Sequence, residues 1–302
     1  MRKPGIYAAF LAITTAAAGV SFGAEILKMK PIVSGYTDAH GGGLKQPEGV
    51  GCDGKSLVVV ADTGNGRLVE YKFTGEVLTP IADIALPQLS YPIRVQVDPK
   101  GGIHALDGKS RRIVRISPSG EFRGYVEPKD ADSAVPMVPR SFRIDRNGIV
   151  YILDVLSGRV LLLDPEGKVV RGIAFPKEFG FLSDLDVDDS GTVFVIDSIG
   201  RKVFSAPKDA AVLSPIPGNL KEDLDFPTSL AADARGNLLV LDQNGGGVVV
   251  LGRDGTFRGR QLGMGWKEGF LRYPSQICVG GDGSVFIADR GNNRVQAFLS
   301  NK

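Results

Sequence analysis

Histidine, cysteine and tryptophan are scarce in this chain of 302 residues, which has two histidines, two cysteines and one tryptophan. His40 and His104 are too few and too far apart in the sequence for a three-histidine zinc site. Cys52 and Cys278 form no C-x-x-C or C-x-x-C-H motif, which excludes a thioredoxin-like redox pair, a zinc knuckle and covalently attached haem. The sequence therefore predicts no metal and no cofactor, and neither histidine is expected to take part in chemistry.

An excess of one charge and long apolar runs are also missing from most of the chain. The 36 basic residues nearly balance the 34 acidic ones, and no run of five Lys or Arg residues occurs. A nucleic-acid partner is not expected, because proteins that bind nucleic acids carry a clustered basic surface. After residue 24 no stretch is long and apolar enough to cross a bilayer, so the mature chain is not expected to insert into a membrane.

The first 24 residues have the composition of a secretory signal peptide. Arg2 and Lys3 precede a mostly apolar, alanine-rich stretch over 6–20, and small residues follow at Ser21 and Gly23. Cleavage would leave a mature chain of residues 25–302 with 34 basic and 34 acidic residues, in the periplasm or outside the cell. An uncleaved anchor is the alternative, but the apolar stretch is shorter than the roughly 20 residues of a spanning helix.

One pattern recurs six times in the rest of the chain. The units begin at Pro47, Pro92, Pro139, Leu182, Pro227 and Pro274. Each unit has an aspartate 15 residues later, at Asp62, Asp107, Asp154, Asp197, Asp242 and Asp289. Successive aspartates are 45, 47, 43, 45 and 47 residues apart. A period of about 40–50 residues is typical of propellers and solenoids, in which each unit packs on the next.

The unit that begins at Pro139 shows what one repeat contains. Apolar and polar residues alternate over 139–144, a tight turn with Gly148 follows, and 149–153 is a continuous apolar run. A third strand is expected over 159–163 and a fourth after the turn at 164–167. Four antiparallel strands make one propeller blade, so the sequence predicts a single all-β domain, a six-bladed propeller over 25–302.

The two ends of the chain complement each other. The last unit stops after its third strand, at Phe298 or Leu299, whereas an additional strand is expected at the start of the mature chain, over 26–33. We expect this N-terminal strand to complete the sixth blade, because ring closure removes an open sheet edge.

Two segments resemble the NHL repeat. The clearer one reads G-M-G-W-K-E-G-F-L-R-Y-P-S-Q-I-C-V-G-G-D-G-S-V-F-I-A-D-R-G-N-N-R-V-Q-A-F over 263–298, and the second reads A-D-T-G-N-G-R-L over 61–68. Units two to five match less closely, because they lack the middle asparagine of the N-x-R core. The resemblance extends over residues 25–302 and implies a six-bladed β-propeller, exported and bacterial, of a kind that usually serves as an interaction platform.

Several charged and reactive residues are expected to have structural roles. A cation stands five residues after the second aspartate in five units, at Arg67, Arg112, Arg159, Lys202 and Arg294. We expect each cation to form a bridge with its aspartate across the second and third strands.

Cys52 and Cys278 lie on inner strands of neighbouring blades, but with opposite parity, and we expect two free thiols. His104 fills a position that is apolar or aromatic in the other units, so it is expected to be a packed, hydrogen-bonded core residue.

Polar residues of the inner strands form the first candidate site. The strand parity places Arg94, Gln96, Arg143, Asp184 and Asp186 near the axis. They predict either a pocket for an anionic or amide-bearing ligand, or an internal cluster of ion pairs. Asp184, Asp186 and Asp188 also resemble the start of a calcium loop, which lacks the required glycine and the final acid.

The loops that connect successive blades form the second candidate site, because they all emerge on one face. They carry Tyr36, His40, Tyr91, Met137, Phe179, Phe181, Trp266, Phe270 and Tyr273. Aromatic side chains on loops suit recognition of a protein or a glycan, although several of them could instead pack between blades. The candidate binding residues are therefore Trp266, Phe270, Tyr273 and His40 on this face, with Arg94, Arg143 and Asp184 in the channel.

These observations favour a non-enzymatic binding or assembly module with a protein or glycan partner in the cell envelope. The alternative is a metal-dependent, lactonase-like hydrolase or a lyase that uses the central channel. No G-x-S-x-G motif supports a serine hydrolase.

Overall fold

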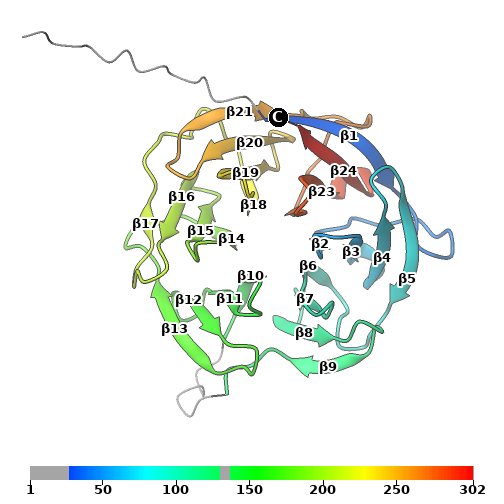
Figure 1. The fold of residues 1–302 in the computed structure, drawn as a ribbon, viewed down its shortest axis with the longest axis horizontal. Coiled ribbons are helices and arrows are strands. Elements are labelled where there is room, and N and C mark those ends of the chain that lie inside the picture. Colours follow the sequence, from blue (N-terminus) through cyan, green and yellow to red (C-terminus); the bar gives the residue numbers. More distant parts are fainter. Residues whose placement is uncertain (1–26, 130–136, 302) are drawn as a thin grey trace, which may run out of the picture.

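The computed structural model describes residues 27–129 and 137–301 (without the side chain of residue 301) as a ring of six four-stranded antiparallel sheets (Figure 1). This confirms the predicted all-β, six-bladed propeller. The predicted signal peptide lies outside the described residues. Within the described part of the chain, no helix is long and apolar enough to span a membrane.

Each blade has its first strand nearest the axis and its fourth strand at the rim (Figure 1). Blade 1 contains β2 (Gly49–Cys52), β3 (Leu57–Asp62), β4 (Arg67–Phe73) and β5 (Leu78–Ile84). Blade 2 contains β6 (Pro92–Val97), β7 (Ile103–Asp107), β8 (Arg112–Ile116) and β9 (Phe122–Tyr125). Blade 3 contains β10 (Pro139–Ile144), β11 (Val150–Asp154), β12 (Arg159–Leu163) and β13 (Val169–Ala174).

The other three blades repeat this order. Blade 4 contains β14 (Leu182–Val187), β15 (Val193–Asp197), β16 (Lys202–Ala206) and the two-residue β17 (Ser214–Pro215). Blade 5 contains β18 (Pro227–Ala232), β19 (Asn237–Asp242), β20 (Gly247–Gly252) and β21 (Phe257–Gln261). Blade 6 contains β22 (Ile277–Val279), β23 (Ser284–Asp289), β24 (Arg294–Asn301) and β1 (Lys28–Gly35). Short 3₁₀ turns, Thr63–Asn65 and Arg290–Asn292, follow the second strands of blades 1 and 6.

The N-terminal strand closes the ring, as predicted. β1 pairs antiparallel with β24 from Lys28 opposite Asn301 to Gly35 opposite Val295. Figure 1 shows β1, in blue, beside β24, in red. The strand begins and ends two residues later than the sequence indicates, and a bulge interrupts its pairing between Pro31 and Val33. Proline cannot donate to a ladder, so its place on this outermost strand is compatible with the sheet.

The repeated turns separate the two faces of the ring. In blade 3, Asp145 accepts hydrogen bonds from the backbone of Asn147 and Ile149, both at 2.9 Å, and Gly148 has a φ of 80°. Glycine tolerates this left-handed conformation without a Cβ clash. Such short turns occupy one face, whereas the loops between blades and the loops from second to third strands occupy the other. We call the latter the long-loop face.

The hydrophobic core lies in the seams between blades. Each of six buried clusters in the described residues combines two neighbouring blades; one example joins Leu106 and Ile113 of blade 2 to Phe142 and Ile152 of blade 3. Burial of apolar area is therefore shared by adjacent units, and no blade is expected to be stable alone.

Cys52 and Cys278 form a disulfide bond, so the prediction of two free thiols was wrong. Their Cα atoms are 6.1 Å apart, although the residues belong to blades 1 and 6. Inner strands converge near the axis: a Cβ added to Gly51 would lie 2.8 Å from the carbonyl oxygen of Val95 in blade 2. In addition, each blade packs one side of its sheet against the other side of the next blade's sheet. Two residues on adjacent inner strands therefore point toward one another when their strand parities are opposite, as those of Cys52 and Cys278 are.

Candidate binding face and central channel

The second aspartate of every unit holds the loop that enters its own blade. It accepts a backbone hydrogen bond at 2.7–2.9 Å from Lys45, Tyr91, Val138, Phe181, Phe226 and Arg272 in blades 1 to 6. All six aspartates are buried. The repeated carboxylates are therefore structural, and their lone pairs are used within the protein.

The predicted bridge from this aspartate to a cation forms only in blades 1 and 6 among the described residues. Arg67 Nε lies 2.9 Å from Asp62 Oδ2, and Arg294 Nε lies 2.7 Å from Asp289 Oδ2. The prediction is wrong for blades 2 to 4: Arg112 pairs with Glu127, Arg159 donates to Ser157 Oγ, and Lys202 is exposed. In those blades the backbone of the second-to-third strand loop donates to the aspartate instead.

Blade 5 obtains its cation from another strand. Arg260 of β21 lies 3.0 Å from Asp242 and replaces the side chain that Gly247 lacks.

Arg294 joins two loops of the long-loop face. Arg294 is only 1% exposed, and its guanidinium group donates to the hydroxyl oxygen of Tyr36 at 3.0 Å and to the carbonyl oxygens of Lys267 and Phe270 at 2.8 Å. Burial alone would lower the pKa of Arg294, but its hydrogen bonds with Tyr36 and Asp289 raise the pKa above the ordinary value. A single buried arginine thus fixes the loop before β2 against the loop before β22.

The loop at 263–273 has further anchors to the same blade. Asn292 donates to the carbonyl oxygen of Gly265 at 2.9 Å, and Gln296 bonds to the backbone of Gly269 and Phe270. Trp266 projects from this anchored loop with 77% of its surface exposed. The asparagine and arginine of the last repeat therefore position a solvent-exposed tryptophan.

Large exposed apolar side chains are concentrated on the long-loop face. Of fourteen in the described residues, nine lie in its loops: Tyr36, Val155, Leu156, Phe179, Ile199, Met264, Trp266, Phe270 and Tyr273. The other five, Val77, Ile81, Val170, Val212 and Phe257, lie on outer strands, beside them or in a short turn. Tyr91, Met137 and Phe181, which the sequence places on the same face, are partly buried.

Sequence reasoning missed part of this surface. It considered only the loops between blades, whereas Val155, Leu156 and Ile199 follow the second aspartates of blades 3 and 4. The signal was present in the sequence as an apolar residue within two positions of Asp154 and Asp197.

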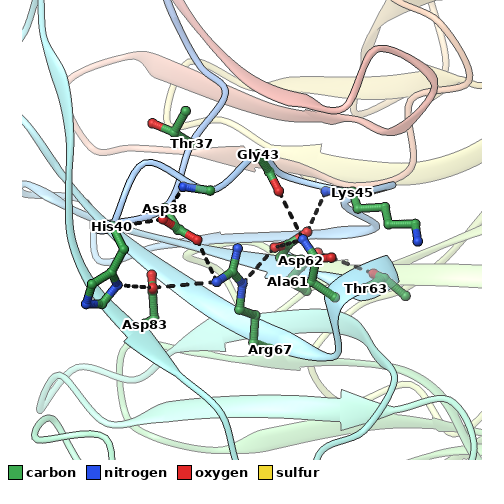
Figure 2. A network of polar contacts seen from close by, with 12 residues as sticks. Thr37, Asp38, His40, Gly43, Lys45, Ala61, Asp62, Thr63, Arg67 and Asp83 are labelled. Atoms are coloured by element: carbon green, nitrogen blue, oxygen red, sulfur yellow. Dashed lines mark hydrogen bonds and ion pairs between the residues drawn. The ribbon is translucent and has the colours of Figure 1, made fainter.

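Figure 2 shows the polar network around His40. His40 Nδ1 is 2.9 Å from Asp83 Oδ2, and the His40 side chain is 82% exposed. Arg67 Nη1 lies 2.6 Å from Asp38 and 3.6 Å from Asp83. Asp38, His40 and Asp83 bring three metal-ligating atoms within 4.8 Å of one another, an arrangement that the sequence did not reveal. The guanidinium group of Arg67 already supplies the positive charge that these carboxylates attract.

The same network determines the ionisation of its members. Burial raises the pKa of Asp38, but backbone hydrogen bonds from Gly42 and His40 and the contact with Arg67 together lower the pKa by more, so the net shift is downward. Asp38 and Arg67 therefore form an ion pair that holds the loop before β2, and a metal ion would have to displace Arg67.

The polar residues of the central channel bond to one another. Asp184 accepts hydrogen bonds from Ser141 Oγ of blade 3 and from Ser229 Oγ of blade 5. Arg143 Nε lies 2.7 Å from Asp186, and Arg143 Nη1 donates to Gln96 Oε1 at 2.9 Å. Burial raises the pKa of Asp186, and the charge of Arg143 opposes that shift. These carboxylates tie blade 4 to both of its neighbours.

Arg94 extends across the axis of the ring. Its Nη2 donates to the carbonyl oxygen of Thr228, in the blade on the opposite side, at 3.3 Å, and its Nε is 4.0 Å from Asp184 Oδ1. Two arginines and two aspartates thus occupy the channel together. The predicted site residues form two groups, since Trp266, Phe270, Tyr273 and His40 lie on the long-loop face and Arg94, Arg143 and Asp184 lie at the axis.

Comparisons with known proteins place the chain among propellers. Residues 271–298 match the NHL repeat. No curated protein sequence matches the chain. A gluconolactonase structure from Xanthomonas campestris has a TM-score of 0.67 and 14% identity, with 91% of this chain and 90% of that chain covered. Virginiamycin B lyase from Staphylococcus aureus has a TM-score of 0.60 and 11% identity, with coverages of 90% and 98%.

Hydrazine synthase from Kuenenia stuttgartiensis is similar to the same degree, with a TM-score of 0.60, 14% identity and coverages of 84% and 95%. Identities this low establish a shared fold and leave function to be argued from the site.

Proposed function

We propose that this six-bladed propeller, which carries an NHL repeat, is a non-enzymatic module that binds a protein partner through its long-loop face. The observation that carries the proposal is that nine of the fourteen exposed large apolar side chains among the described residues lie in the loops of that face. Clustered exposed apolar residues mark interaction sites, and tryptophan and tyrosine are enriched among the residues that dominate binding energy.

The rigidity of the loops supports the same function. Arg294, Asn292 and Gln296 fix the backbone on both sides of Trp266. An anchor that is already ordered loses less conformational entropy on binding than a mobile one. The face is therefore suited to recognise a protein without rearrangement.

The channel gives less support to a metal-dependent hydrolase or lyase. Asp184 and Asp186 have hydrogen-bonding partners in the neighbouring blades, and Arg94 and Arg143 lie beside them. Two guanidinium groups oppose the entry of a cation into this space. The lyase and lactonase names belong to structures that share the fold at 11–14% identity.

Export to the periplasm or the outside of the cell is part of the proposal. Two independent features support it: the signal-like residues 1–24 and the disulfide between Cys52 and Cys278. Disulfides persist mainly in oxidising compartments.

The test is capture of the partner from an envelope fraction by the immobilised mature protein, with Trp266→Ala as the diagnostic variant. Truncation of a binding hot spot often costs about 2 kcal/mol, which corresponds to roughly 30-fold weaker binding. Phe257→Ala is the matched control, because Phe257 is an exposed aromatic residue on β21, away from the long-loop face. We expect Trp266→Ala to lose capture and Phe257→Ala to retain it, both with unchanged melting temperature.

Equal capture by both variants would contradict the proposal. Release of the captured material by glycosidase treatment would identify a glycan instead of a protein. A stoichiometric calcium or zinc ion in the purified protein, together with lactone hydrolysis or lyase activity, would favour the enzyme.

A further inference from the structure

A large pocket opens between blades 2 and 3, near the short-turn face and away from the long-loop face. Its volume is about 1010 Å³. Its walls include Ile116, Phe122 and Tyr125 of blade 2 and Ile144 and Val150 of blade 3. Pockets of about 300–1,000 Å³ are typical of sites for small molecules, so this one is large enough for an organic ligand.

Two polar side chains in the wall have unsatisfied nitrogen atoms. His104 is only 8% exposed, and its Nδ1 is buried without a hydrogen-bond partner. The nearest carboxylate oxygen, Asp98 Oδ2, is 3.7 Å away, which is beyond hydrogen-bonding distance. Arg115 Nε is also buried without a partner. The prediction of a packed core histidine is thus confirmed by its burial, and Nδ1 is the ring atom that has no hydrogen-bond partner.

The two residues are adjacent in space. His104 of β7 pairs directly with Arg115 of β8, so their side chains are on the same face of the sheet. Arg115 forms no ion pair with any described residue, whereas Arg112 and Arg123 on the same blade pair with Glu127 and Glu121. Arg115, like Lys100 and Lys129, therefore contributes to the pocket wall a charge that no ion pair with a described residue neutralises.

The repeat provides an internal comparison for these positions. The equivalent cross-strand pairs are Val59 with Glu70, Tyr151 with Leu162, Phe194 with Ser205, Leu239 with Val250 and Phe286 with Ala297. Only blade 2 combines an imidazole with a guanidinium group. Burying polar groups without partners costs roughly 1–3 kcal/mol each, so this departure from the repeat needs a reason.

We propose that the pocket between blades 2 and 3 binds a small organic anion with an aromatic or apolar body. A carboxylate or sulfonate accepts hydrogen bonds from Arg115 and from His104 Nδ1, the two groups that lack partners. The apolar body lies against Phe122 and Tyr125, whose rings form an edge-to-face pair with centroids 5.2 Å apart. Ligand binding then satisfies the polar groups that the folded protein alone leaves unpaired.

The test uses a fluorescent probe of this class, 8-anilinonaphthalene-1-sulfonate, titrated into the mature protein. Uncharged 1-anilinonaphthalene serves as the matched probe without the anion. Hydrogen bonds to charged groups contribute about 1.5–3 kcal/mol, so Arg115→Met should weaken sulfonate binding by at least roughly 10-fold. The affinity for the uncharged probe should change by less than about two-fold, because its contacts are apolar.

A second variant separates a ligand site from a structural role. His104→Phe introduces the side chain found at Phe194 and Phe286, and should abolish binding of the sulfonate probe while the melting temperature stays the same or rises. Controls are Arg201→Met, which removes a charge on the other face, and Trp266→Ala, which alters the proposed protein-binding surface. Both should bind the probe as the wild type does.

Absence of saturable probe binding to the wild type would overturn the proposal, and so would unchanged binding by Arg115→Met and His104→Phe. Loss of binding in Trp266→Ala would show that the probe occupies the long-loop face and would also contradict it. If His104→Phe unfolds, His104→Leu, which introduces the side chain found at Leu239 of blade 5, replaces it in the same comparison.

Discussion

At the scale of single residues, His104 shows how burial alters ionisation. Burial lowers the pKa of His104 to about 4; the Asp98 carboxylate opposes this shift and the Arg115 charge adds to it. The folded protein thus holds a neutral imidazole, whereas the unfolded chain titrates near 6.5. The resulting stabilisation is present above pH 6.5 and is lost as the pH falls from about 6.5 through 4.

His104→Phe should therefore reduce the acid sensitivity of the protein. Between pH 7 and pH 4 we expect the wild type to lose up to about 3 kcal/mol more of its free energy of unfolding than the variant does. Urea titrations at both pH values measure the difference. Parallel losses in the two proteins would show that other groups determine the acid response.

The same repeat position can be essential or dispensable, depending on its burial. Arg294→Met removes a buried cation that bonds to Asp289, Tyr36 and two carbonyl groups, and should lower the free energy of unfolding by about 3–5 kcal/mol. Lys202→Met, five residues after Asp197, changes an exposed side chain and should have an effect below about 1 kcal/mol. Chemical denaturation of both variants tests this ranking.

Hydrogen exchange gives the Arg294→Met experiment a second measurement. We expect faster amide exchange at 263–273 in this variant, because the loop loses its bonds at Lys267 and Phe270. Similar destabilisation by both methionine variants would mean that burial is not what distinguishes the two positions.

At the scale of elements, β1 supplies the strand that blade 6 lacks. Deletion of residues 27–35 should expose the edge of β24 and cause the protein to aggregate, because unpaired strand edges recruit other chains. Size-exclusion chromatography measures the outcome. Addition of a synthetic peptide of residues 27–35 should reduce the aggregation, since it can pair with the same edge. A monodisperse deletion variant with unchanged melting behaviour would show that β1 is not required.

At the scale of the whole molecule, the disulfide closes the ring a second time. It joins residues 226 positions apart, and the chain-entropy relation gives a stabilisation of about 5 kcal/mol for a loop of this length. We expect reduction, or the double variant Cys52→Ala and Cys278→Ala, to lower the free energy of unfolding by about 2–5 kcal/mol. Guanidinium denaturation with and without a reductant measures this, and the double variant should not respond to the reductant.

Thiol counting gives a direct check of the bond. The denatured, unreduced mature protein should contain no reactive thiol, because the chain has only these two cysteines. Two reactive thiols would contradict the disulfide and would remove one of the two supports for export.

The sequence by itself determined the number of blades, the four strands of each blade and the use of an N-terminal strand for closure. The blades and their strands depend on contacts that are close in the sequence and leave a period of two in the apolar residues. Closure joins the two ends of the chain, and it was predictable because the last unit has only three strands and an additional strand precedes the first unit. The positions of Asp145 and Gly148 predicted a turn for the same reason, because a turn is completed within a few residues.

Only the tertiary structure decided which residues of different blades and loops contact one another. The disulfide, the Asp38–Arg67–Asp83 cluster and the link from Arg294 to Tyr36 each join residues whose separation depends on how the blades or their loops converge. The unpaired nitrogens of His104 and Arg115 also became visible only when the seam between blades 2 and 3 was formed. A sequence specifies which residues face a seam, whereas the packing of the closed ring determines which of them meet.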